Sequence, residues 1–100
     1  MAYERLMGMQ ILDDEKYTQY REAMYPLLKQ HGGDFGYDFK ISEVLKAETS
    51  EPINRVFTIH FPNKKKMESF FSNETYLQIK EKYFSPSVGA VTPIALYEKL

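Results

Sequence analysis

The sequence predicts an α+β fold in which helices cover one face of a four-stranded antiparallel sheet. The first observation is an amphipathic helix that ends at Gly32 and Gly33, where the apolar residues change from a helical to a strand period. The second is the order of the predicted elements, in which a strand, a helix and a strand follow one another twice. Together they predict the order βαββαβ in a single domain, residues 1–100.

The first strand is predicted over Tyr3–Ile11, where both faces are partly apolar, as in a strand that is covered on two sides. Asp13 or Asp14 is expected to cap the helix that follows. Its apolar positions recur at spacings of three and four and form one buried stripe: Tyr17, Tyr20, Met24, Leu27, Leu28 and His31. Pro26 lies inside this pattern, so we expect a kink or a break there.

The glycine pair is expected to end this helix, because glycine readily adopts the left-handed conformation that closes a helix. We expect Gly33 to hold the positive φ, so that Gly33→Val would destabilise the junction. The second strand is predicted to start after Gly33 and to run to about Leu45, followed by a loop over Lys46–Pro52. Its apolar residues alternate with polar ones, as in an edge strand: Phe35, Tyr37, Phe39 and Ile41.

The second half of the chain predicts one strand, two short helices and a last strand. The strand is Arg55–Phe61, with Phe57, Ile59 and Phe61 on one face and Val56, Thr58 and His60 on the other. Asn63 can cap the first short helix, whose apolar stripe is Met67, Phe70 and Phe71, and the second is predicted over 73–83. The last strand, 91–97, has Pro93 near its start, which favours an edge position.

Composition and charge limit the classes of function. The net charge of −1 provides no electrostatic basis for binding nucleic acid or an anionic membrane. Cysteine is absent, which excludes a disulfide framework, a thiolate nucleophile and cysteine-ligated metals. The two histidines do not have metal-ligand spacing, so neither a metal nor another cofactor is expected. No apolar run approaches the length of a membrane span, and we expect a cytoplasmic protein.

The sheet face opposite the helices is expected to be apolar and to mediate association. We place Met7, Met9, Val56 and Thr58 on this face, where they would form a patch too apolar for open water. A two-fold dimer in which two sheets stack would bury the patch on both chains. The sequence therefore predicts a homodimer.

Four short motifs follow one another along the chain: Tyr17-x-x-Tyr20-Arg21, His31-Gly32-Gly33, His60-Phe61-Pro62 and Tyr76-x-x-x-Lys80. With them the chain, from Tyr3 to Glu98, resembles a domain-of-unknown-function family of the dimeric α+β barrel superfamily, whose fold is ferredoxin-like. That superfamily includes cofactor-free antibiotic-biosynthesis monooxygenases, muconolactone isomerase-like enzymes, haem-handling members and many proteins with no known activity. The resemblance implies the fold and a dimer, and it implies no single reaction.

A ligand site is predicted in a partly apolar cavity between helices and sheet, the usual form of a small-molecule site. The candidate ligand-binding residues are Tyr20, Tyr37, His60 and Tyr83. For the tyrosines the alternative is core packing with hydroxyl groups that reach the surface. His60 is also the candidate catalytic residue, because imidazole can donate or accept a proton near neutral pH, and its alternative is a structural histidine.

Three hypotheses for function follow. The first is a dimeric protein that binds a small apolar or aromatic molecule without turnover. The second is a cofactor-independent monooxygenase- or isomerase-like enzyme that acts on an aromatic or enolisable small molecule, with His60 as acid or base. The third is a structural or regulatory interaction module whose dimer face is its purpose.

Overall fold

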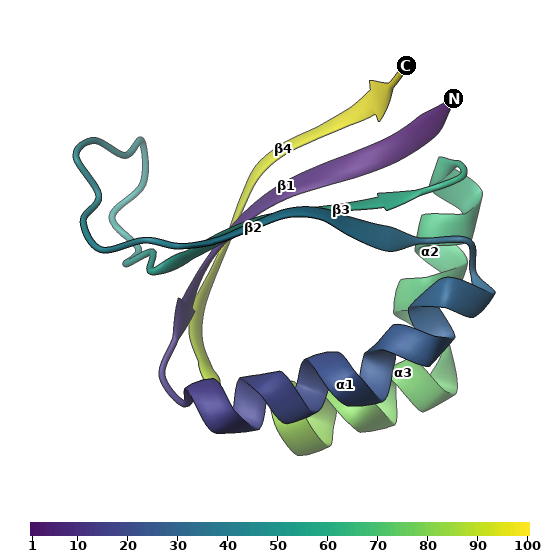
Figure 1. The fold of residues 1–100 in the computed structure, drawn as a ribbon, viewed down its shortest axis with the longest axis horizontal. Coiled ribbons are helices and arrows are strands. Elements are labelled where there is room, and N and C mark those ends of the chain that lie inside the picture. The colour runs from purple at the N-terminus through teal and green to yellow at the C-terminus, as the bar shows by residue number, and fades with distance from the viewer.

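The computed structural model describes residues 1–100 as a four-stranded antiparallel sheet with helices on one face (Figure 1). The elements are β1 (Ala2–Ile11), α1 (Asp14–Gln30), β2 (Asp34–Lys40), β3 (Arg55–Phe61), α2 (Lys64–Ser72), α3 (Glu74–Ile79), a π-helical turn η1 (Lys80–Phe84) and β4 (Val88–Lys99). The strands lie in the order β2-β3-β1-β4, so β2 and β4 form the edges as predicted. This is the predicted ferredoxin-like fold.

Helix α1 begins at the predicted cap and continues through its proline. The Asp13 carboxylate accepts a hydrogen bond from the Lys16 amide at 3.0 Å. The expected break at Pro26 does not occur. Pro26 faces solvent, and the buried side chains of Met24 and Leu28 on either side of it anchor both halves of the helix to the sheet.

The two glycines that end α1 have different roles. Gly32 has a φ of 75°, and Gly33 does not lie in the left-handed region, so the predicted position of the positive φ was one residue too late. The Gly33 amide donates to the Leu28 carbonyl and the Gly32 amide to the Lys29 carbonyl, each at 3.0 Å, which is a Schellman motif. Gly33 is needed for close approach, since a Cβ atom there would lie 2.9 Å from the His60 carbonyl oxygen.

Strand β2 is shorter than predicted, and β4 is longer. β2 ends at Lys40, and residues 41–54 form a loop that extends beyond the sheet (Figure 1). The two ends of the loop are joined by a hydrogen bond from the Ile41 amide to the Asn54 carbonyl at 2.8 Å. At the other edge, β4 pairs with β1 along nearly the full length of both strands, which extends it beyond the predicted range of 91–97.

A bulge in β2 changes the faces of its aromatic residues. The register shifts between Phe35 and Asp38, so that Phe35 lies opposite Ile59 whereas Phe39 lies opposite Val56. Phe35 therefore faces the helices and Phe39 faces away from them. The prediction that the alternating aromatic residues of β2 share one face is wrong, because the bulge inserts an unpaired residue into the alternation.

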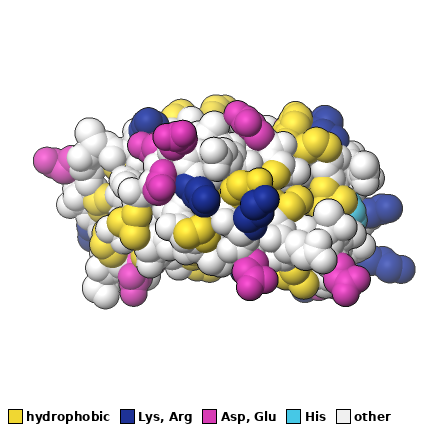
Figure 2. Space-filling view, turned by 90° about the horizontal axis from the view of Figure 1, so that it is seen from below, with side chains coloured by type: hydrophobic (Ala, Val, Ile, Leu, Met, Phe, Trp, Pro, Cys, Tyr) yellow, Lys and Arg dark blue, Asp and Glu magenta, His cyan; other side chains and the backbone are white.

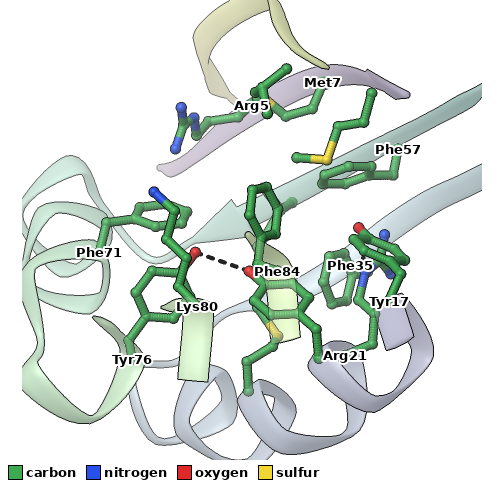
Figure 3. Close-up of a pocket in the computed structure, with 15 residues that line it drawn as sticks. Arg5, Met7, Tyr17, Arg21, Phe35, Phe57, Phe71, Tyr76, Lys80 and Phe84 are labelled. Atoms are coloured by element: carbon green, nitrogen blue, oxygen red, sulfur yellow. Dashed lines mark hydrogen bonds between the residues drawn. The ribbon is translucent and has the colours of Figure 1, made fainter. Parts of the chain in front are cut away.

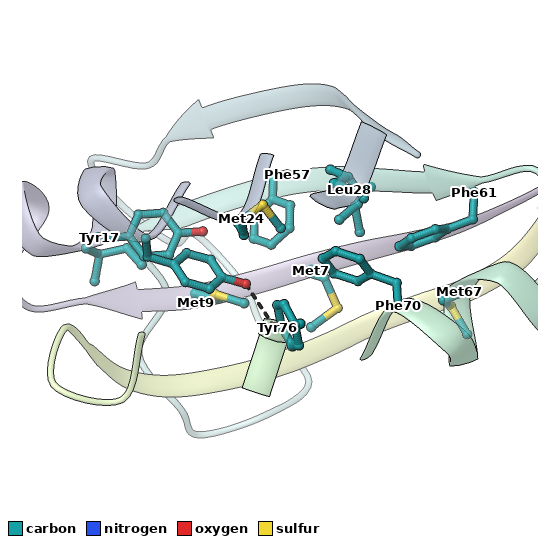
Figure 4. Close-up of a cluster of buried hydrophobic side chains, with 13 residues drawn as sticks. Met7, Met9, Tyr17, Met24, Leu28, Phe57, Phe61, Met67, Phe70 and Tyr76 are labelled. Atoms are coloured by element: carbon teal, nitrogen blue, oxygen red, sulfur yellow. Dashed lines mark hydrogen bonds between the residues drawn. The ribbon is translucent and has the colours of Figure 1, made fainter. Parts of the chain in front are cut away.

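The core lies between the helices and the covered face of the sheet (Figure 4). Met7 and Met9 belong to it, with exposed fractions of 4% and 6%. Their predicted place on the uncovered face is wrong, because the register sets Met7 opposite Phe57 and Gly8 opposite Val56. Opposed residues share a face, so the two methionines lie on the helix side.

Candidate ligand cavity

A cavity of about 250 Å³ lies between α1, α3, η1 and the covered face of the sheet (Figure 3). Fifteen residues line it, and twelve of them are hydrophobic, chiefly aromatic rings and methionines. The charged residues of the lining are all cations: Arg5 from β1, Arg21 from α1 and Lys80 from η1. The cavity thus combines an aromatic interior with positive charge.

Arg21 is held by protein groups at one end of the cavity. Its Nε donates to the Tyr17 hydroxyl at 2.9 Å, and its Nη1 donates to the Asp38 carboxylate at 3.3 Å. The centre of its guanidinium lies 3.9 Å from the centroid of the Phe35 ring and 4.7 Å from that of Phe57. These contacts fix the guanidinium as part of the wall, although its buried Nη2 has no hydrogen-bond partner.

Asp38 is shared by two arginines. Arg55 donates to it from Nε and Nη2, each at 2.8 Å, and Arg21 approaches the same carboxylate. Burial alone would raise the pKa of Asp38, but the hydrogen bonds and charges of Arg55 and Arg21 outweigh it and hold the pKa below its ordinary value. Asp38 is therefore ionised at neutral pH and offsets part of the positive charge of the two arginines at this end.

Two tyrosine hydroxyls meet in the buried interior. The hydroxyls of Tyr20 and Tyr76 lie 2.9 Å apart, and these side chains are 5% and 4% exposed (Figure 4). Burial raises the pKa of both, and for Tyr20 the neighbouring Tyr76 hydroxyl adds to the effect. Both are protonated at neutral pH. Their mutual bond uses one of the two hydroxyl hydrogens, which leaves the other for a ligand.

Arg5 lies at the end of the cavity formed by Phe71 and Tyr76 (Figure 3). Its guanidinium centre is 4.8 Å from the Phe71 ring centroid, and its buried Nε has no hydrogen-bond partner. Burial lowers the pKa of Arg5, yet a guanidinium stays protonated in proteins. Lys80 extends to the same end, with Nζ 5.7 Å from the Phe84 ring centroid. Neither cation forms an ion pair.

The four residues predicted to bind a ligand are not brought together. Tyr20 lines the cavity, as predicted for a site between helices and sheet. Tyr37 is 67% exposed on β2, and His60 lies on the uncovered face, opposite Glu4 in the register. Tyr83 packs against the edge of the core from η1 and is not part of the cavity lining. The predicted roles of these three residues in ligand binding or catalysis stay predictions.

The sequence interpretation did not assign Arg5, Arg21 or Lys80 to the cavity, although Arg21 and Lys80 belong to motifs quoted above. Arg5 carried a signal, because it occupies the same phase of β1 as the buried Met7 and Met9. Tyr76 and Lys80 are spaced by one helical turn and therefore share a face. The spacing within this helical segment does not show that β1, which carries Arg5, lies next to it in the fold.

The fold and the cavity define a small ferredoxin-like α+β protein. The chain belongs to the family described as domain of unknown function DUF1330, whose model matches residues 5–91. A search of curated proteins finds no match. None of its helices is both long enough and apolar enough to span a lipid bilayer.

Solved structures show the same fold. A protein of unknown function from Rhodopseudomonas palustris has a TM-score of 0.82 at 16% identity, over 99% of this chain and 82% of the other. A dimeric ferredoxin-like protein of unknown function from Jannaschia has a TM-score of 0.64 at 13% identity, over 99% and 100%. An antibiotic biosynthesis monooxygenase-like protein from Nitrosomonas europaea has a TM-score of 0.57 at 14% identity, over 99% and 90%.

Proposed function

We propose that this protein binds a small, partly apolar molecule in the cavity between its helices and its sheet. The observation that carries the proposal is a cavity of about 250 Å³ with an aromatic lining and a few polar donors. An engineered apolar cavity of about 150 Å³ is enough to hold benzene. The cavity therefore has room for one aromatic ring with a polar substituent.

The polar groups of the cavity favour binding over proton transfer. They are guanidinium, ammonium and protonated phenol groups, all of which donate hydrogen bonds at neutral pH. An enzyme that uses His60 as acid or base would need a substrate on the uncovered face, away from this cavity. A rate on an aromatic or enolisable substrate that collapses in His60→Ala, with the fold intact, would favour the enzyme instead.

Thermal denaturation with one-ring aromatic probes tests the binding proposal. A ligand at roughly 100 times its Kd adds about 2.7 kcal/mol to the free energy of unfolding and raises Tm by several degrees. Val91→Trp should block the cavity, because Val91 lines it from an edge strand and is 43% exposed. Leu77→Trp is the matched control, since Leu77 is 46% exposed on α3 and does not line the cavity.

The proposal predicts Tm shifts in the wild type and in Leu77→Trp, and their loss in Val91→Trp. It fails if no neutral or charged one-ring probe changes Tm. It also fails if Val91→Trp binds the probes as well as the wild type does.

We also propose that the protein is a homodimer that associates through the uncovered sheet face. Phe39, Ile94 and Tyr97 on this side are 51%, 49% and 37% exposed. A hollow of about 830 Å³ separates the 41–49 loop from this face near Val56. Exposed apolar patches of this kind mark association surfaces. The proteins from Jannaschia and Bacteroides fragilis with the same fold are described as dimeric.

Native mass spectrometry tests the dimer directly. The wild type should have the mass of two chains, and Phe39→Glu should shift it to one chain because a buried carboxylate opposes stacking of the sheets. Leu77→Glu is the matched control, since Leu77 is 46% exposed on the helix side. A wild-type monomer would contradict the dimer and favour an interaction module with another protein partner.

A further inference from the structure

The end of the cavity at Arg5 has an uncompensated positive charge. Its guanidinium is partly buried, lies over the Phe71 ring and forms no ion pair with any carboxylate of the chain. Its Nε is buried without a hydrogen-bond partner, and a cation that is partly removed from water gains free energy from an anionic partner. Arg5 therefore has hydrogen-bond capacity left for an anion.

No carboxylate near Arg5 forms an ion pair with it. Glu98 lies opposite Tyr3 on the same face of the sheet as Arg5, yet it is not among the ion pairs of the chain. Glu4 is next to Arg5, but consecutive side chains of a strand point to opposite faces. Glu4 is accordingly held on the uncovered side, where it accepts hydrogen bonds from the Tyr97 hydroxyl and the Lys99 ammonium. Asp38 is occupied by Arg21 and Arg55 at the other end of the cavity. Arg5 is therefore left without a carboxylate partner within the chain, and an anion from outside can take that place.

Other donors converge on the same end. Lys80 reaches it from η1, one helical turn after Tyr76 (Figure 3). Tyr76 and Tyr20 are close enough to Arg5 to affect its pKa, and their hydroxyl pair has one hydrogen left to donate. A guanidinium, an ammonium and a phenol thus surround one place beside an aromatic cavity. This is the donor set of a site for an organic anion.

The charge belongs to the cavity and not to a wide basic surface. Seen from the helix side, acidic and basic side chains are interspersed with small apolar groups (Figure 2). The net charge of −1 agrees with this mixed surface. A polyanion therefore has no extended surface to follow, whereas a small anion can enter the cavity.

We propose that the cavity selects small aromatic carboxylic acids, with the carboxylate bound by Arg5 and Lys80 and the ring in the aromatic interior. This inference rests on the proposed function, because it assumes that the cavity binds a ligand. The hydroxyl hydrogen of the Tyr20 and Tyr76 pair completes the set of donors. A carboxylate is favoured over a phosphate because a doubly charged group costs more to remove from water beside apolar walls.

Isothermal titration with phenylacetate and its neutral isostere phenylacetamide tests this selectivity. The wild type should bind phenylacetate about tenfold more tightly or better, because hydrogen bonds to charged groups are stronger than those to neutral ones. Arg5→Met and Lys80→Met should each reduce this preference while phenylacetamide binding is retained. Lys82→Met is the matched control, since Lys82 is exposed two residues away and does not line the cavity.

The outcomes separate the two proposals. Equal affinity for the acid and the amide in the wild type would overturn the inference and leave the binding cavity standing. If neither phenylacetate nor phenylacetamide binds, the inference is overturned, and the binding proposal fails as well if no other one-ring probe changes Tm. Tighter binding of benzyl phosphate than of phenylacetate would contradict the preference for a carboxylate and assign the site to an organic phosphate. Lys80→Met keeps the test decisive even if Arg5→Met does not fold, because Lys80 is exposed.

Discussion

The two ends of the cavity differ in the contacts that the protein provides to their arginines. Arg21, whose side chain is 15% exposed, contacts the Asp38 carboxylate and the Tyr17 hydroxyl. Arg5 contacts an aromatic ring and no carboxylate. Both are cations in the wall of one apolar cavity, yet only the first has an anionic partner within the chain. The first is therefore part of the architecture, and the second remains available to a ligand.

This difference has an energetic meaning. An arginine with a well-placed carboxylate recovers the cost of its desolvation, whereas an unpaired one does not. Groups that lower the stability of the free protein are retained where function needs them. The comparison thus predicts that substitutions at the Arg21 end reduce stability and that substitutions at the Arg5 end change binding.

The largest effect is expected from Asp38→Asn, which removes the anion between Arg21 and Arg55. We expect a loss of about 1–2 kcal/mol in the free energy of unfolding, in the lower part of the usual range because Asp38 is partly exposed. Urea denaturation measures it. Asp14→Asn is the control, because Asp14 and Lys40 form an exposed pair at 3.8 Å. Equal losses of unfolding free energy in Asp38→Asn and Asp14→Asn would show that Asp38 contributes no more than an exposed ion pair does.

The next effect concerns the hydroxyl pair between the two ends. Tyr20→Phe and Tyr76→Phe each leave a buried hydroxyl without its partner, which costs about 1 kcal/mol. The double variant should lose less than the sum of the two single losses, because no unpaired hydroxyl remains. Thermal denaturation of the four proteins completes this double-mutant cycle. Strict additivity would show that the hydroxyls do not interact in solution.

The pH dependence of stability tests the Asp38 end by a second route. The folded pKa of Asp38 lies below its ordinary value of 3.8, so its contribution is present above that pH and is lost as pH falls through the folded pKa. The Tm difference between wild type and Asp38→Asn should therefore be constant near neutral pH and shrink in acid. A Tm difference that persists in acid would assign the effect to something other than ionised Asp38.

The smallest effect on stability is expected at the other end. Arg5→Met loses a cation–π contact with Phe71 but also removes a partly buried charge that has no ion-pair partner. The two terms oppose each other, and we expect the free protein to stay within about 0.5 kcal/mol of the wild type. Urea denaturation without ligand measures this. A loss in the free energy of unfolding as large as that of Asp38→Asn would show that Arg5 has a structural role and would contradict the difference between the two ends.

Local sequence patterns determined the element types and their order. Three predictions from local patterns are confirmed: the helix caps at Asp13 and Asn63, and the edge position of β4 from its proline. Each was read from a short segment of the chain. The sequence also indicated a cavity between helices and sheet and placed Tyr20 in it. Such features are readable because helices and strands impose their periods on short segments.

Only the tertiary structure decided which residues share a face and which side chains lack a partner. The faces of Met7 and Met9 depend on their register with β3, about 50 residues away in the chain, and a bulge in β2 separates Phe35 from Phe39. Whether Arg5 has a carboxylate beside it depends likewise on the packing of β1 against α2 and α3. These contacts join segments that are far apart in the chain, so the periodicity of one segment cannot predict them.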